Sequence, residues 1–189
     1  MKTLTQRLRG KADWNFEIEP RFMGFHRYGY PGAFSDEVEE VIKTLVAGSN
    51  NILHLFSGVS KIGNVRVDLE RPEATIKMNV FEFIKTKEAQ REWECCILDP
   101  PYNIYNPEID LKGYGDTASV SASIPKRNAL AKFFLAHCKN VLWFDQSAPL
   151  PFGFIRKKLW IFFPGGYRTL RVLSWLQRKD IKLKDFIIN

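Results

Sequence analysis

The stretch Cys95-Cys-Ile-Leu-Asp-Pro-Pro-Tyr102 decides the predicted fold. It opens with a short, continuous apolar run, which is typical of a β-strand covered on both faces in a parallel sheet. Asp99 follows, and the two prolines behind it remove backbone donors and end the strand. Ligands of open α/β sheets bind at the carboxyl ends of the strands, so we expect this strand to present Asp99 to a ligand.

The rest of the chain predicts helices and strands in alternation. Ser35 is a suitable N-cap, and apolar residues at helical spacing follow it towards Gly48; a second helix is expected over 128–138. The predicted strands are 51–56, 65–69, 74–78, 95–98, 141–144, 159–163 and 170–175. The last two form a hairpin, and the pattern favours a layered α/β domain with a mostly parallel sheet and a C-terminal antiparallel hairpin.

Length and composition set further limits. At 189 residues, of which 45% are apolar, the chain suits a single domain over 1–189 with no separate target-recognition domain. No apolar run reaches the roughly 18–20 residues of a membrane-spanning helix, so we expect a cytoplasmic protein that binds no membrane. The cysteines at 95, 96 and 138 fit no metal-ligand spacing, so we expect buried thiols and no metal site.

Positive charge is concentrated in the last third of the chain. The formal net charge is +7, and from Lys126 to Asn189 there are 13 Lys and Arg against 3 Asp and Glu. Such a surface either binds a polyanion or is simply well solvated. The candidates for contact with nucleic-acid phosphates are Arg156, Lys157, Lys158, Arg168 and Arg171. Two structural interpretations stay open: 156–158 is a solvated charge run, or 170–175 is an edge strand that its Arg residues guard against pairing.

The chemistry of Asp99-Pro-Pro-Tyr102 is specific. The Asp99 carboxylate and the neighbouring carbonyl oxygens form a group of hydrogen-bond acceptors, which suits a substrate with hydrogens on nitrogen, such as the exocyclic amino group of a base. Tyr102 offers a flat face on which a base can stack, an interaction worth about 1–3 kcal/mol. The alternative is a proline-terminated strand with an exposed Asp and a packed Tyr.

The ends of two earlier strands indicate a bound cofactor. Phe56-Ser-Gly58 follows the first strand, and small residues there let the backbone approach a ligand closely. Asp68 ends the second strand, where a carboxylate can accept hydrogen bonds from ribose hydroxyls.

With Asp99-Pro-Pro-Tyr102, these motifs resemble the S-adenosylmethionine-dependent amino-methyltransferases of nucleic acids, especially the DNA adenine-N6 type. The resemblance covers roughly residues 28–105 and includes Tyr30-Pro-Gly-Ala-Phe-Ser35 as an N-terminal cofactor motif. It implies a Rossmann-like class I methyltransferase domain with S-adenosylmethionine as cofactor. The cofactor-binding residues it implies are Tyr30, Pro31, Gly32, Phe34, Phe56, Ser57, Gly58, Asp68 and Asn79.

The resemblance also implies an adenine-specific DNA methyltransferase whose catalytic residues are Asp99, Pro100, Pro101 and Tyr102. Asp99 and the Pro100 carbonyl would accept hydrogen bonds from the amino group and direct its lone pair at the methyl on sulfur. Tyr102 would stack on the base after it is flipped out of DNA. Methylation of RNA or of cytosine N4, and a non-catalytic nucleic-acid-binding subunit, stay open as alternatives.

Three departures from the family pattern lead to further expectations. The loop Phe56-Ser-Gly-Val-Ser60 lacks the usual second glycine. The nine residues between Gly58 and Asp68 leave no room for a full helix between the first two strands. Without a recognition domain, the target sequence would be read by the loop over 103–125, by the basic C-terminal third, or by a specificity partner, and a homodimer is also open.

Overall fold

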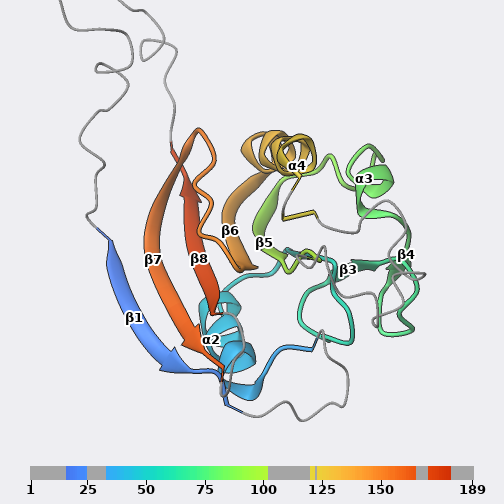
Figure 1. The fold of residues 1–189 in the computed structure, drawn as a ribbon. Helices are drawn as coiled ribbons and strands as arrows, with labels where there is room; N and C mark the ends of the chain where they lie inside the picture. The colour runs from blue at the N-terminus through green and yellow to red at the C-terminus, as the bar shows by residue number, and fades with distance from the viewer. Residues whose placement is uncertain (1–15, 25–32, 102–119, 122, 165–169, 180–189) are drawn as a thin grey trace, which may run out of the picture.

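One eight-stranded sheet organises the described part of the chain (Figure 1). The computed structural model describes residues 16–24, 33–101, 120–121, 123–164 and 170–179. The strands are β1 (Glu17–Phe22), β2 (Ile52–Leu55), β3 (Val65–Asp68), β4 (Ile76–Lys77), β5 (Trp93–Leu98), β6 (Cys138–Asp145), β7 (Phe154–Phe163) and β8 (Arg171–Arg178). The helices are α2 (Asp36–Val46), α3 (Val80–Phe83) and α4 (Ile124–His137).

The sheet is mixed but mostly parallel. Its strand order is β1-β7-β8-β6-β5-β2-β3-β4. Only β8 is antiparallel to its neighbours, and it lies between β6 and β7. The predicted α/β class, with its mostly parallel sheet and antiparallel C-terminal hairpin, is confirmed. The suggestion that 170–175 is an edge strand is wrong, because β1 and β4 form the two edges.

Two apolar clusters cover the two faces of the sheet. In the α2 cluster, Val38 and Ile42 of the helix pack on the strands. In the α4 cluster, residues of α3 and α4 do so on the other face. Cys95 belongs to the first cluster and Cys96 to the second, because neighbouring residues of a strand point to opposite faces. The cysteines are buried free thiols, as predicted, and burial raises the pKa of Cys95 to about 12.

The helices begin where the chain offers a cap. The Ser35 hydroxyl accepts a hydrogen bond from the N–H of Val38, which confirms the predicted start of α2. The predicted start of the second helix at residue 128 is wrong. Helix α4 begins at Ile124, because Ser123 caps it and Pro125 lies in the first turn, where a missing N–H costs nothing.

Strand β1 was not predicted from the sequence. Its residues Glu-Ile-Glu-Pro-Arg-Phe lack a continuous apolar run, because an edge strand is only partly covered. It pairs in parallel with β7, with Glu17 opposite Lys158. Among the described residues, no helix is long and apolar enough to cross a membrane. The single domain over 1–189 stays a prediction.

Candidate functional site

The strand order reverses between β2 and β5. The chain passes from β2 outward to β3 and β4, then returns to place β5 on the other side of β2. The carboxyl ends of β2 and β5 therefore lie side by side, and we call this edge of the sheet the carboxyl edge. In open α/β sheets such a reversal is where ligands bind. Here it brings Phe56-Ser-Gly58 next to Asp99, whose N–H donates to the Leu55 carbonyl at 3.5 Å.

The loop after β2 is strained. Phe56 has a φ of 55°, in the left-handed region that non-glycine residues rarely adopt, and Gly58 has a φ of 54°. Between them, Ser57 donates its N–H to the Val67 carbonyl at 3.0 Å. The Ser57 hydroxyl is buried without a partner among the described residues. Strain of this kind, together with an unpaired buried hydroxyl, is typical of a ligand site.

Asp68 ties this loop to the end of β3. One carboxylate oxygen accepts from the Gly58 N–H at 3.0 Å, and the other accepts from the N–H groups of Glu70 and Arg71, each at 3.2 Å. A carboxylate has about four acceptor positions, so three backbone donors leave one for a ligand. The structure thus brings together Gly58 and Asp68, and the ribose contact itself stays a prediction. As expected, residues 56–64 contain turns and no helix.

Two other predicted cofactor residues, Asn79 and Phe34, lie on opposite faces of the sheet, and among the described contacts only those of Asn79 lead to this loop. Asn79 caps α3 by accepting from the Phe81 N–H at 2.8 Å, and the Phe81 ring packs against Phe56 with a centroid distance of 6.3 Å. On the opposite face of the sheet, Phe34 stacks on His54 at 5.7 Å. Burial lowers the pKa of His54 to about 4, so this histidine is neutral and packs in the core.

Asp99 lies at the carboxyl edge, where the residue as a whole is partly exposed and its carboxyl group is buried. Burial raises its pKa well above the ordinary value, the positive charge of Arg171 opposes that rise, and the negative charge of Asp145 adds to it. Pro100 is buried, and the Pro101 carbonyl accepts from the Ser121 N–H at 3.4 Å. The backbone that carries Asp99 is thus held on both sides.

Five predicted site residues lie outside the described part of the chain. They are Tyr30, Pro31, Gly32, Tyr102 and Arg168. Most of the 103–125 loop also lies outside it. Their roles stay predictions.

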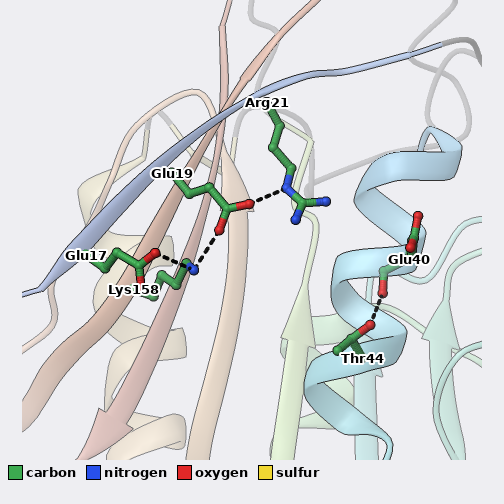
Figure 2. A network of polar contacts seen from close by, with 6 residues as sticks. All are labelled: Glu17, Glu19, Arg21, Glu40, Thr44 and Lys158. Carbon is green, nitrogen blue, oxygen red and sulfur yellow. Dashed lines mark hydrogen bonds and ion pairs between the residues drawn. The ribbon is translucent and has the colours of Figure 1, made fainter.

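Two of the predicted phosphate contacts are engaged within the protein. Arg156 donates from Nη2 to the carbonyls of Ala148 at 2.6 Å and Pro149 at 3.2 Å, which pins the segment between β6 and β7. Lys158 lies between two carboxylates of β1, with Nζ 2.8 Å from Glu17 and 2.6 Å from Glu19 (Figure 2). Arg156 and Lys158 thus have partners within the protein, while Lys157 is exposed. Their contacts with phosphate stay predictions.

Arg178 is engaged as well. Its Nη1 donates to the carbonyls of Leu135 and Ala136 at 3.3 Å each, in the last turn of α4. Cationic side chains favour this end of a helix, so Arg178 stabilises α4.

Asp145 is a site residue that the sequence analysis missed. It ends β6 and is fully buried. Its carboxylate accepts from Trp143 Nε1 at 3.1 Å and from the N–H groups of Gln146 at 2.6 Å and Ser147 at 3.4 Å. Like Asp99 it directly follows an apolar run in the sequence, and that signal alone points to it.

Comparison with known proteins adds no family. No protein-family model matches the chain, and a search of curated proteins found no match. Among the described residues, no group of three or more His, Cys, Asp or Glu side chains could hold a metal ion.

Proposed function

We propose that this protein transfers a methyl group from S-adenosylmethionine to an exocyclic amino group of a nucleic-acid base, with adenine N6 in DNA as the first candidate. One observation carries the proposal: Asp99-Pro-Pro lies beside the strained loop Phe56-Ser-Gly58, where the strand order reverses. The reversal and the antiparallel β8 also support a Rossmann-like methyltransferase fold.

The described residues fit such a cofactor. The unpartnered Ser57 hydroxyl is available to a polar ligand group, and Asp68 keeps one acceptor position for a hydroxyl. When bound, S-adenosylmethionine would supply a methyl group on a positively charged sulfur. The Gly58 backbone, held by Asp68, would allow the close approach that this group needs.

Asp99 and the Pro100 carbonyl would perform the chemistry. Both would accept hydrogen bonds from the amino group, so that its nitrogen lone pair points at the methyl carbon. The amino nitrogen would take the methyl group, whose bonding pair would stay on sulfur, and would lose a proton to the Asp99 carboxylate. A carboxylate whose pKa is raised by burial is a stronger acceptor for that proton.

A single incubation tests the proposal. The protein is mixed with methyl-labelled S-adenosylmethionine and either duplex DNA or RNA, and the nucleosides are analysed by mass spectrometry. N6-methyladenine in DNA is the expected product. Labelled RNA or N4-methylcytosine would favour the alternative substrates, and cofactor binding without any labelled nucleoside would favour the non-catalytic subunit.

A further inference from the structure

The register of the sheet brings three charged residues to the carboxyl edge from separate parts of the chain. Leu98 pairs with Trp143, so Asp99 lies level with Phe144, one residue before Asp145. Asp145 in turn pairs with Val172, the second residue of β8. Because β8 is antiparallel, its first residue, Arg171, lies at the same edge.

The alternation of side chains assigns these residues to faces. Ile97 and Leu173 belong to the α2 cluster. Asp99 lies two residues after Ile97, and Arg171 lies two residues before Leu173, so both are on the face of the α2 cluster. The backbones of β5 and β8 are two strand spacings apart, about 10 Å. At this edge the Arg171 guanidinium donates from Nη1 to the Leu170 carbonyl at 3.3 Å, and its charge acts on Asp99 across the sheet through a Coulomb interaction. Asp145 lies two residues after Trp143, which belongs to the α4 cluster, so Asp145 is on the other face of the sheet.

Asp145 is held in place by three donors. Its buried carboxylate accepts hydrogen bonds from the Trp143 indole N–H and from two backbone N–H groups. Two charged residues at this edge act on Asp99 in opposite directions: beside the larger rise caused by burial, Arg171 lowers its pKa and Asp145 raises it.

Other described elements around Asp99 add no comparable charge. The loop 56–58 after β2 has no ionisable side chain. Asp68 faces the Gly58 N–H and the turn that follows β3. His54 on β2 is neutral, because burial lowers its pKa to about 4.

We propose that Arg171 and Asp145 are opposed positioning residues for Asp99: Arg171 keeps it a charged acceptor at the carboxyl edge, and Asp145 limits that charge. The role assigned to Arg171 differs from the phosphate contact expected from the sequence. A phosphate contact acts on nucleic acid, whereas a positioning residue acts on Asp99 whether or not nucleic acid is present.

Titration of the free protein tests the electrostatic half of this proposal, independently of any activity. The side-chain carboxyl signal of Asp99 is followed by ¹³C NMR and assigned by its loss in Asp99→Asn. Arg171→Gln should move the midpoint to higher pH, and Asp145→Asn should move it to lower pH. Arg171→Lys, which keeps the charge, should restore most of the original midpoint.

Lys139→Gln is the matched control. It removes the same charge from an exposed position at the opposite end of β6, and should leave the midpoint in place. If Asp145→Asn does not fold, the comparison of Arg171→Gln with Arg171→Lys still shows whether the charge of Arg171 sets the Asp99 midpoint. An unchanged midpoint in Arg171→Gln would overturn the proposal.

The catalytic half rests on the proposed methyl transfer. The acidic limb of the pH profile of kcat/KM should move with the NMR midpoint of Asp99. At a pH below that midpoint, activity should fall about tenfold for each pH unit by which the midpoint moves up. Salt dependence of DNA binding should stay unchanged in Arg171→Gln. A slope reduced by about 0.9, with an unmoved midpoint, would mean a phosphate contact instead. Absence of methyl transfer would refute the proposed function and leave the NMR result to stand by itself.

Discussion

At the residue scale, the buried carboxyl of Asp99 makes stability depend on pH. Its pKa is raised in the folded protein, so the folded state binds this proton more tightly than the unfolded chain. The stabilisation is therefore complete at a pH below the pKa of the unfolded chain, about 3.9. It is lost as the pH rises through the higher pKa of the folded protein.

We predict that, at a pH above this range, Asp99→Asn has a higher melting temperature than the unmodified protein. Its melting temperature should also fall less with rising pH, because the neutral amide carries no buried charge. Thermal denaturation across the acid-to-neutral range measures this. Each 1 kcal/mol corresponds to about 2–4 °C for a chain of this length. Equal melting temperatures for both proteins at neutral pH would contradict it.

The same residue is predicted to be essential for methyl transfer. Asp99→Ala removes the acceptor for the amino group, and loss of one positioned electrostatic partner typically costs about 10²–10³-fold in rate. Cofactor affinity, measured by calorimetry, should stay nearly unchanged. A tritiated-methyl assay that gave wild-type activity would rule out the assigned role.

Asp68 is predicted to act on the cofactor. Asp68→Ala removes the acceptor for the Gly58 N–H, so the loop after β2 should lose its shape and cofactor affinity should fall about 10-fold or more, since hydrogen bonds to charged groups contribute about 1.5–3 kcal/mol. Glu70→Ala, at the exposed neighbour, is the control. Calorimetric titration showing equal affinities would disprove it.

At the element scale, the start of α4 depends on one side chain. The Ser123 hydroxyl accepts from the Lys126 N–H at 3.4 Å. We predict that Ser123→Ala costs about 1 kcal/mol of stability, the usual effect of losing an N-cap. Chemical denaturation measures it, with Ser147→Ala at an exposed loop position as control. Equal losses in both variants would argue against a capping role.

Strand β1 is held at the edge partly by ion pairs. Lys158 bridges Glu17 and Glu19, and Arg21 pairs with Glu19 (Figure 2). The hydrogen bond from Lys158, and after it the one from Arg21, lowers the pKa of Glu19. Exposed pairs are worth about 0–1 kcal/mol each and are screened by salt. We predict that Lys158→Gln destabilises the protein slightly at low ionic strength and not at high. Melting curves at two salt concentrations test this, and a loss independent of salt would oppose it.

At the scale of the whole molecule, three of the cations that the structure describes in the C-terminal third have partners within the protein. Arg156 anchors the segment between β6 and β7, Lys158 holds β1, and Arg178 caps α4. Counting charges in the sequence treats these side chains alike, whereas the fold gives each a different partner.

Local pattern sufficed for elements whose residues signal their own environment. Apolar runs located β2 and β5, and Ser35 located the start of α2. Strand β1 was missed because a polar edge strand has no apolar run, and the start of α4 was missed although Ser123 and Pro125 mark it.

The sequence by itself determined the α/β class, the buried thiols, and the position of Asp99 at the end of a strand, because each depends on the polarity and backbone preferences of adjacent residues. Only the tertiary structure decided that β8 inserts between β6 and β7 and that Arg171 and Asp145 reach the same edge of the sheet as Asp99. Strand order and register follow from packing among distant segments, which no local pattern encodes.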